Sequence, residues 1–422
     1  MISTVLTNSL AAEMSPLTPR LSPYSRILSR FFEFLALFSI LRKAEGPHVI
    51  TNYNLSTLEA TRRRFLRNLC FICDYMKGGD TTTSIAVEDQ PDCFMFWVTG
   101  NVTPTSTVID FLDRVLDTLK SWLPQFRFDT TADTLSLCHA AYRAREDPQM
   151  TTLQILSRED STTLEHAISF RAIRHFVGRL AERIRVPKQL VEDASRLGTL
   201  LSSHRVASVS APQPAIVPPP DVQTTLHSIT RRILGAGDPR TEEFQEFLTR
   251  LDEQTGLETK VRTMYDRGDM QSRVHAELQM LEFFYRAGRV FVENDRYIAC
   301  SKLACLCCKL YFRHHPGFYV EPDSHQKVYT NWRPIILHKA EEDPRFLEQR
   351  ALLGKVGRDI GNMLQDHIAL QQTSVVLQPD SITNITTSED MSFDSSDFEY
   401  ESLGEYETDE GKFSIRPMLI RT

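Results

Sequence analysis

Apolar residues recur at helical spacing along most of the chain. In residues 57–76, Phe65, Leu69 and Ile72 fall on one helix face, and two glycines at 78–79 end the pattern. The same spacing predicts helices at residues 24–41, 108–122, 134–143, 163–200, 223–234 and 242–265. Most of the folded chain is therefore expected to be helical.

One segment changes to a strand-like pattern. SIAVED and CFMFWVTGN, within residues 84–101, are rich in β-branched and aromatic residues, and the turn-forming residues 90–92 separate them. This is the clearest β-hairpin prediction in the chain.

Composition divides the chain further. The Pro-rich stretch ASVSAPQPAIVPPPD cannot sustain a helix and predicts an extended surface linker. Between Asp380 and Glu410 there are eleven acidic and no basic residues, so the rest of the chain, whose total charge is -7, carries +4. The predicted parts are a disordered N-terminus at 1–23, a helix-rich region with the hairpin at 24–206, the linker at 207–222, a second folded domain at 223–370 and a disordered acidic tail at 371–422.

Length and hydrophobic content exclude some classes of protein. A chain of 422 residues, 41% of them hydrophobic, can bury the core of one large or two ordinary domains. Its first residues lack the basic start and apolar run of a secretory signal. The apolar stretch at 31–41 contains Glu33 and is far shorter than the roughly 20 apolar residues of a spanning helix. We therefore expect a cytoplasmic or nuclear protein without membrane contact, whose cysteines stay reduced.

Four of the eight cysteines lie close together in CSKLACLCC, residues 300–308. In a reducing compartment such a cluster indicates a metal site or catalysis rather than disulfides. Upstream, His275 and Glu277 open a stretch with a helical pattern, residues 288–300 predict one or two strands, and residues 302–312 predict another helix. The order is a helix with H-x-E, a strand, and a helix with C-x-x-C.

This order has a chemical rationale. Cys305 and Cys308 are three positions apart, so on a helix their sulfurs face the same side and can bind one zinc ion. His275 would be the third ligand, which leaves the fourth tetrahedral position open for water. Zinc makes hydroxide available near neutral pH, and Glu277 would take the water proton and return it to a leaving nitrogen. H-x-E followed by P-C-x-x-C is the signature of zinc deaminases that act on cytosine or adenine.

The motifs also resemble a known family. The OTT-type deaminase-like proteins, found mostly in fungi and placed in the cytidine and nucleic-acid deaminase superfamily, are similar in HAE at 275–277, SKLACLCC at 301–308 and SHQKVYTNW at 324–332. The resemblance is best over residues 272–334 and weaker over 84–101. It implies an α/β fold with a cytidine-deaminase-like sheet flanked by helices, zinc between the HAE and C-x-x-C helices, and a large helical N-terminal or inserted region. Residues 223–370 would then be the zinc domain.

The match departs from the family pattern at one position, and other cysteines compete as ligands. Ala304 stands where the superfamily has a proline that shapes the helix start. Cys307 would face away from the ligand pair on a helix, and Cys300 ends the predicted strand, so we expect both to pack. A second C-x-x-C, Cys70 and Cys73, lies in an apolar helix and is expected to be core.

The end of the hairpin carries a further candidate. VTGNV resembles the G-x-N-V of cytidine deaminases, whose asparagine contacts the sugar, although here no residue separates Gly100 from Asn101. By this resemblance Asn101 would approach the pocket, and residues 102–272 would be a helical insertion into the sheet. Alternatively, the hairpin belongs to an independent helical domain and Asn101 is an ordinary turn residue. Whether the strand end lies near His275 distinguishes these alternatives.

Candidate substrate contacts follow the C-x-x-C helix. A predicted strand at 318–320 leads into a loop with His325, Tyr329 and Trp332. Aromatic rings can stack on a base, and a histidine can bond its edge. The alternative is that Tyr329 and Trp332 pack under the loop while His325 faces water.

Charged surfaces give weaker indications of a partner. The basic helix face of Arg62, Arg63, Arg64 and Arg67 is expected to be solvated surface. The acidic tail is either a solubilising extension or an intramolecular competitor for a basic groove on the body.

The sequence thus predicts a zinc-dependent hydrolytic deaminase of a nucleobase in a nucleoside, a nucleotide or single-stranded nucleic acid, with Glu277 as the proton shuttle and ammonia as the leaving group. The alternative is a catalytically inactive, zinc-stabilised interaction protein with the deaminase fold. In that case Glu277 would form a structural ion pair, or Cys300 or Cys307 would close the site. A thiol redox protein using Cys305 and Cys308 would leave the HAE motif unexplained.

Overall fold

The computed structural model describes residues 21–41, 48–50, 56–76, 78–122, 181–235, 237–266 and 271–369. Its strands are β1 (Thr83–Asp89), β2 (Phe94–Gly100), β3 (His204–Ser208), β4 (Ala215–Ile216), β5 (Gln271–Ser272) and β6 (Ala299–Cys300). Its helices include α1 (Pro23–Leu41), α2 (Thr57–Cys73), α3 (Ser106–Trp122), α7 (Gly198–Ser202), α8 (Leu226–Leu234), α9 (Thr241–Thr255), α10 (Leu257–Asp266), α11 (Ala276–Ala287), α12 (Leu306–His314) and α13 (Phe346–Ala369). Residues 181–196 are also helical.

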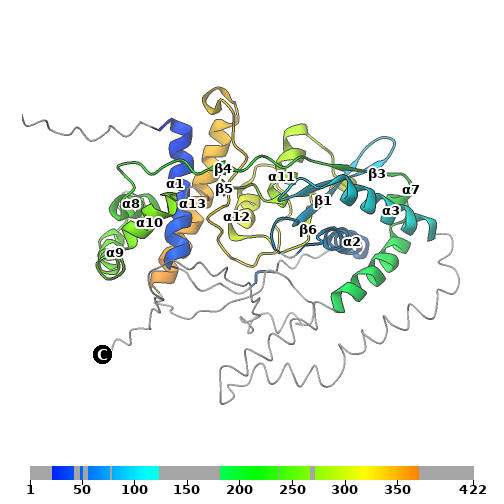
Figure 1. The fold of residues 1–422 in the computed structure, drawn as a ribbon, viewed down its shortest axis with the longest axis horizontal. Coiled ribbons are helices and arrows are strands. Elements are labelled where there is room, and N and C mark those ends of the chain that lie inside the picture. The colour runs from blue at the N-terminus through cyan, green and yellow to red at the C-terminus, as the bar shows by residue number, and fades with distance from the viewer. Residues whose placement is uncertain are drawn as a thin grey trace, which may run out of the picture.

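A small mixed sheet, with the strand order β3-β2-β1-β6, lies in the right-hand half of the molecule in Figure 1. The hairpin predicted at 84–101 is confirmed: β1 and β2 pair antiparallel, from Thr83 opposite Gly100 to Asp89 opposite Phe94. Strand β3 adds parallel to β2, and β6 adds antiparallel to β1. The α/β class predicted from the sequence is thus confirmed in this general form.

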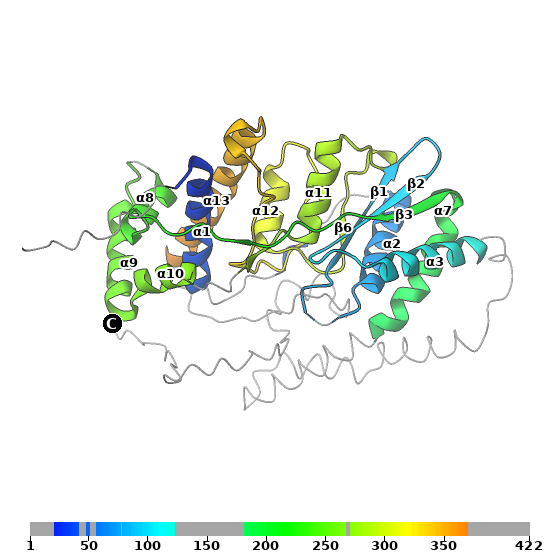
Figure 2. The same ribbon diagram turned by 45° about the horizontal axis from the view of Figure 1, so that its top comes forward.

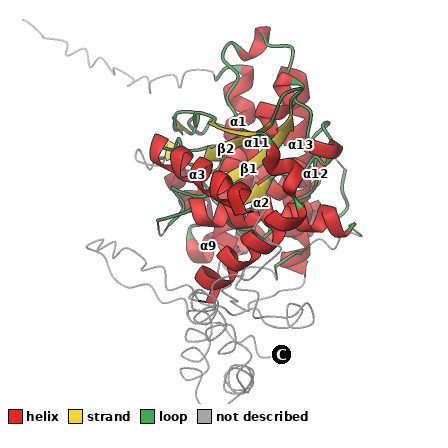
Figure 3. Ribbon diagram, turned by 90° about the vertical axis from the view of Figure 1, so that its right-hand side faces the viewer, coloured by secondary structure: helices red, strands yellow, loops and turns green. Residues whose placement is uncertain are grey.

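Helices cover both faces of the sheet, as Figure 3 shows. Alternation along β1 explains why, because successive side chains of a strand point to opposite faces. Ile85 and Val87 pack in one core with residues of α2, α3 and α7, whereas Ala86 packs in the other core with residues of α11 and α12. All three residues are fully or almost fully buried. The sheet is therefore the layer between two hydrophobic cores.

The core around α11 and α12 continues into a group of helices at the other end of the molecule (Figure 2). Helices α1 and α13 pack against each other there, and small residues allow the close approach. A Cβ at Gly357 of α13 would lie 2.9 Å from the Phe34 ring of α1, and one at Gly361 would lie 3.0 Å from Ile233 of α8. Larger residues at these two positions would push the helices apart.

The apolar stretch at 31–41 lies in α1 and is mostly buried, as the sequence predicted. Its single acidic residue, Glu33, is 1% exposed and bonds the Arg232 guanidinium at 2.5 Å and the Thr224 hydroxyl at 2.9 Å. Burial raises the pKa of Glu33, although Arg232 opposes the shift. None of the helices in the described ranges combines the length and hydrophobicity that crossing a bilayer requires.

Predicted elements at three places in the chain differ from the structure. The single helix expected at 242–265 is two helices, because Gly256 between α9 and α10 has a left-handed φ of 64° that ends the first one. The strands expected at 288–300 reduce to β6, because residues 292–294 form a short 3-10 turn with positive φ at Glu293 and Asn294. The expected strand at 318–320 is also wrong: Phe318 has a φ of 52° and is 84% exposed.

The Pro-rich segment is extended, as expected, and its ends add strands. Strand β3 overlaps its start, and β4 within it pairs with β5 just before His275. The main sheet combines β1 and β2 from the predicted helix-rich region with β6 from the predicted zinc domain. The hairpin is therefore not a separate unit, and the division at 207–222 remains a prediction. The expected helix at 134–143, part of that at 163–200, most of the N-terminal segment and the acidic tail lie outside the described residues.

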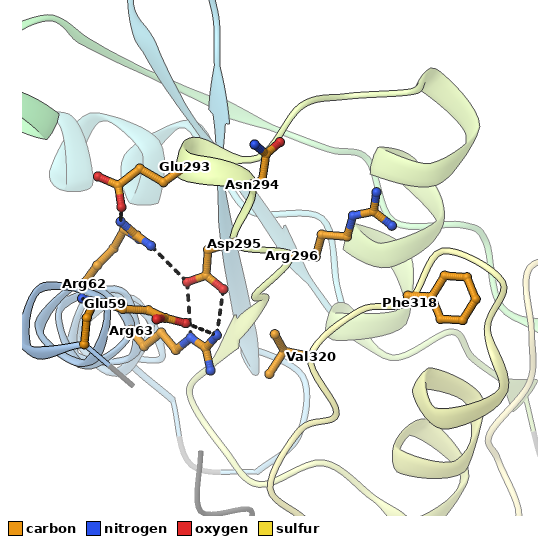
Figure 4. Close-up of a pocket in the computed structure, with 10 residues that line it drawn as sticks. Glu59, Arg62, Arg63, Glu293, Asn294, Asp295, Arg296, Phe318 and Val320 are labelled. Atoms are coloured by element: carbon orange, nitrogen blue, oxygen red, sulfur yellow. Dashed lines mark hydrogen bonds and ion pairs between the residues drawn. The ribbon is translucent and has the colours of Figure 1, made fainter. Parts of the chain in front are cut away.

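Only part of the arginine face of α2 is solvated as expected: the side chains of Arg64 and Arg67 are 37% and 50% exposed. The other two arginines are buried, contrary to the sequence-based expectation. Arg62 is 4% and Arg63 7% exposed, and both bond the carboxylate of Asp295, at 3.2 and 2.8 Å. Figure 4 shows these ion pairs at the side of a 370 Å³ pocket, together with Glu59 and Glu293, which pair with Arg63 and Arg62. The sequence could not reveal this network, because the acidic partners come from the segment after α11.

Two further arginines of the same face also have acidic neighbours. Arg64 pairs with Asp193, which is fully buried, and Arg67 lies 4.0 Å from Asp323. The arginine face thus attaches α2 to three distant parts of the chain.

We predict that Asp295→Asn strongly destabilises the fold, because it leaves two buried guanidinium groups without their shared counter-charge. Removing one partner of a buried pair costs about 3–5 kcal/mol. Chemical denaturation measures the change. Glu192→Gln is the matched control, since Glu192 and its partner Arg196 are both about half exposed, and it should cost less than about 1 kcal/mol. Equal effects of the two variants would contradict the structural role of the network.

Candidate metal centre

Two helices begin at the predicted ligands. His275 occupies the N-cap position of α11, in extended conformation, and Cys305 occupies the N-cap of α12. The Cys305 sulfur accepts a hydrogen bond from the backbone N–H of Cys308 at 3.4 Å, as a capping side chain does. The positive ends of two helix dipoles are therefore directed at the same place, which favours thiolate there.

The three predicted ligands meet. The Nδ1 atom of His275 lies 3.4 Å from the sulfur of Cys305 and 3.4 Å from that of Cys308. All three ligand atoms lie within 4.8 Å of one another. With Zn–S bonds of about 2.3 Å and Zn–N bonds of about 2.0 Å, nitrogen and sulfur ligands of a tetrahedral ion lie roughly 3.5 Å apart. The set therefore fits a metal ion in both chemistry and spacing.

Burial and hydrogen bonding set the charges of the sulfurs. Cys305 is 2% exposed and Cys308 0%. Burial alone would raise the pKa of the Cys305 thiol, but hydrogen bonds from Cys307 and Cys308 and the charge of His275 hold it well below its usual value. Burial raises the pKa of Cys308, and the Cys305 thiolate raises it further. One sulfur of the pair is thus predisposed to be the anion that binds a cation.

Cys300 and Cys307, the other two cysteines of the cluster, do not belong to the candidate metal-binding group. Among the described residues, the metal-binding set consists of the one histidine and two cysteines above. Cys307 is fully buried, and burial raises the pKa of its thiol well above the usual value. Burial also raises the pKa of Cys300 to about 12. Cys70 and Cys73 belong to the core on the other side of the sheet, as expected. No second set of such residues competes for a metal in the described part of the chain.

Glu277 lies one residue into the helix after His275 and is 3% exposed. Burial raises the pKa of its carboxyl group, whereas the positive charge of His275 opposes the shift. The negative charge of Cys305 raises this pKa as well, and a hydrogen bond from Cys308 lowers it. The charged neighbours of Glu277 are therefore the ligands themselves, which is the position that a proton-transferring group at this site requires.

The end of β2 is bonded to the start of α11. The Oδ1 atom of Asn101 accepts the backbone N–H of Ala276 at 2.8 Å, and its Nδ2 donates to the Gly79 carbonyl at 2.7 Å. The hydroxyl of Thr99 donates to the Ala276 carbonyl at 2.8 Å. The hairpin end thus lies beside His275, as an insertion of residues 102–272 into the sheet requires, and Asn101 is a helix cap rather than an isolated turn residue.

Gln279 completes this junction. It is 2% exposed, and its Nε2 donates to the carbonyls of Gly100 and Val274, at 2.9 and 2.8 Å. Sequence reasoning identified neither Thr99 nor Gln279. The resemblance of VTGNV to a strand end at the deaminase pocket was the available signal, since it placed this strand beside the HAE helix.

The loop after α12 runs along the other side of the ligands. Ala304 donates its N–H to the Asp323 carbonyl at 2.9 Å and accepts that of His325 at 3.2 Å. A proline at position 304 has no N–H and could not make the first bond. The departure from the family pattern therefore has a local structural reason.

The three candidate substrate residues lie in different environments. His325 is 2% exposed, and its Nδ1 accepts the N–H of Lys327 at 3.0 Å, so it does not face water. Tyr329 is partly buried, with its ring edge-to-face to that of His275 at 5.8 Å between centroids. Trp332 is 2% exposed and packs between Phe31 and Tyr311. The structure places Tyr329 beside the ligands and Trp332 in the core beneath them.

Comparison with known proteins gives one match. Residues 274–335 match the family described as OTT_1508-like deaminase. This segment contains His275, Glu277, both cysteine ligands and the loop to Trp332, and the resemblance noted in the sequence is thereby confirmed. No curated protein and no solved structure matches the chain.

The ligand assignment predicts how cysteine variants bind zinc. Cys305→Ser and Cys308→Ser should lose tight binding, since each removes one of three ligands, whereas Cys300→Ser and Cys307→Ser should retain about one ion per chain. Elemental analysis of the purified full chain, with Cys307→Ser as the matched control, measures this. Undiminished zinc in Cys308→Ser would contradict the assignment.

The capping role of Asn101 predicts a loss of stability in Asn101→Ala. Removing a helix cap costs about 1 kcal/mol. Asn101→Asp keeps the acceptor for the Ala276 N–H and adds a favourable charge at the helix start, but it loses the donor to the Gly79 carbonyl, so it should restore only part of the loss. Denaturant unfolding of the two variants measures this. Equal losses of stability in both variants would show that the hydrogen bond from the Ala276 N–H to Asn101 does not account for the stabilising effect of Asn101.

Proposed function

We propose that the segment matching the OTT_1508-like deaminase family carries a zinc-dependent hydrolytic deaminase site, which acts on a nucleobase in a nucleoside, a nucleotide or single-stranded nucleic acid. The observation that carries the proposal is a buried carboxyl group, Glu277, beside a set of one imidazole and two thiols. Three protein ligands and an adjacent acid are the arrangement of a catalytic rather than a structural zinc site.

The chain's own residues would divide the work as follows. His275, Cys305 and Cys308 would hold the zinc ion, and the ion would supply an activated water at neutral pH. Glu277 would accept the proton of the attacking water and deliver it to the departing amino group, so that ammonia leaves. Burial, which raises the pKa of Glu277, suits a group that must both take up and release a proton.

Substrate contacts are proposed from position. Tyr329, which lies against the His275 ring, is the best-placed aromatic residue for contact with a base. Asn101 lies at the hairpin end beside the same helix start, and each of its polar atoms keeps capacity for a further hydrogen bond. His325 is buried and would affect substrate binding only indirectly, through the loop beside the start of α12. The ring of Trp332 is too buried to stack on a base.

A variant of the proton shuttle separates catalysis from metal binding. Glu277→Gln should retain zinc and lose about 10²–10⁴-fold in turnover, since it removes general acid–base catalysis and leaves the ligands in place. Ammonia release from a panel of nucleosides, nucleotides and single-stranded DNA and RNA measures turnover, and elemental analysis measures zinc. Glu342→Gln, at a 75% exposed side chain, is the control and should match the wild type.

The outcomes decide between the proposal and a metal-stabilised interaction protein. A substrate turned over by the wild type but not by Glu277→Gln supports the deaminase. Turnover that Glu277→Gln retains in full would contradict the assigned role. Zinc in the wild type without ammonia from any substrate on the panel would favour the interaction protein.

A further inference from the structure

The indole of Trp332 makes a contact that its aromatic character does not explain. Its Nε1–H donates to the sulfur of Cys308 at 3.1 Å. Both groups are buried, at 2% and 0% exposure, so water does not compete for this bond. The contact joins the loop after α12 directly to one of the ligand atoms.

The ring is held in place from two sides. Phe31 of α1 packs on it with centroids 5.4 Å apart, and Tyr311 of α12 packs with centroids 6.1 Å apart. A side chain fixed in this way presents its N–H in one direction at little further entropic cost. The direction of the bond to Cys308 is thus set by packing that includes α1, far from the ligands in sequence.

The backbone on either side of Trp332 is hydrogen-bonded to the segment that precedes His275. Arg273, two residues before His275, donates its N–H to the Asn331 carbonyl at 2.7 Å and accepts that of Arg333 at 3.0 Å. The short segment 331–333 therefore fixes the strand entering His275 through its backbone and the Cys308 sulfur through its side chain. It connects the two helices that supply the metal ligands.

The two sulfurs have different N–H donors. Cys305 accepts the backbone N–H of Cys308, which the start of α12 provides by itself. Cys308 accepts the indole N–H, which only the tertiary fold provides. A hydrogen bond to a metal-bound sulfur orients the ligand and reduces the electron density that it gives to the metal, and such outer contacts tune affinity strongly.

We propose that Trp332 is a positioning residue for the metal centre, which orients the Cys308 sulfur and withdraws charge from it through the indole N–H. The inference rests on the metal site of the proposed function, but not on its substrate or activity. Trp332 is assigned this role in place of a contact with substrate.

The test compares Trp332→Phe, which removes the N–H and keeps an aromatic ring, with the wild-type full chain loaded with Co²⁺ and Zn²⁺. We expect affinity for both ions to fall at least about tenfold, because the Cys308 sulfur loses the donor that orients it and that stabilises its thiolate form against protonation. We also expect the sulfur-to-Co²⁺ charge-transfer band to move to lower energy, because the sulfur becomes more electron-rich. A role in packing alone would not shift this band.

Trp97→Phe is the matched control. It also removes a bonded indole N–H, which donates to Glu88 at 2.8 Å, and should leave affinity and band position unchanged. Wild-type affinity and band position in a folded Trp332→Phe would overturn the proposal. A wild type that binds neither ion would instead contradict the metal site itself, and metal binding without deamination would contradict only the proposed reaction.

If Trp332→Phe does not fold, the wild type loaded with ¹¹³Cd²⁺ answers the same question. The chain has three tryptophans, and the indole proton of one should show scalar coupling to the metal through the hydrogen bond to sulfur. The indole protons of Trp97 and Trp122 serve as internal controls. Absence of coupling at every indole proton would overturn the proposal.

Discussion

The imidazole of His275 lies between two sulfurs that belong to a different helix, and its Nδ1 is 3.4 Å from each of them. This contact depends on the starts of α11 and α12 being held side by side, since each helix supplies ligands from its first turn. A displacement of either helix start by about 1 Å would take the set outside the spacing of a tetrahedral ion.

The scaffold fixes both helix starts. Strand β1 is the common element: it pairs with β2, whose end caps α11 through Asn101, and with β6, which leads into α12. On the other side, the segment 331–333 bonds the strand entering His275 and the sulfur of Cys308. The site is therefore held from the sheet and from the loop, and helix α1 supports it through Phe31.

Buried charges have two different uses in this protein. Asp295 and Glu33 are paired with arginines, and these ion pairs attach helices to the rest of the fold. Glu277 is as deeply buried, but its charged neighbours are His275 and Cys305. A buried carboxyl group beside a candidate metal site is costly for stability, and such local conflicts are expected at functional sites.

Local chemistry in the sequence was sufficient for several parts of the structure. The β-branched and aromatic residues at 84–101, divided by a turn, predicted the hairpin, because a strand buried on both faces needs apolar residues at successive positions. The spacing of Cys305 and Cys308, with His275 on the preceding helix, predicted the group of residues that could hold a metal ion, because a helix turn places residues three apart on one side. The helix break at Gly256 and the 3-10 turn that shortens the strands predicted at 288–300 were missed, since both depend on backbone angles that periodicity does not encode.

Only the tertiary structure decided which partners the remaining side chains have. The charge pattern of α2 indicated a solvated face, but Arg62 and Arg63 are buried beside Asp295, which comes from a distant segment. The aromatic character of Trp332 indicated stacking on a base, but packing against Phe31 directs its N–H to a sulfur. The physical reason is the same in both cases: a sequence pattern reports what one element offers, whereas burial and hydrogen bonding depend on what the fold brings against it.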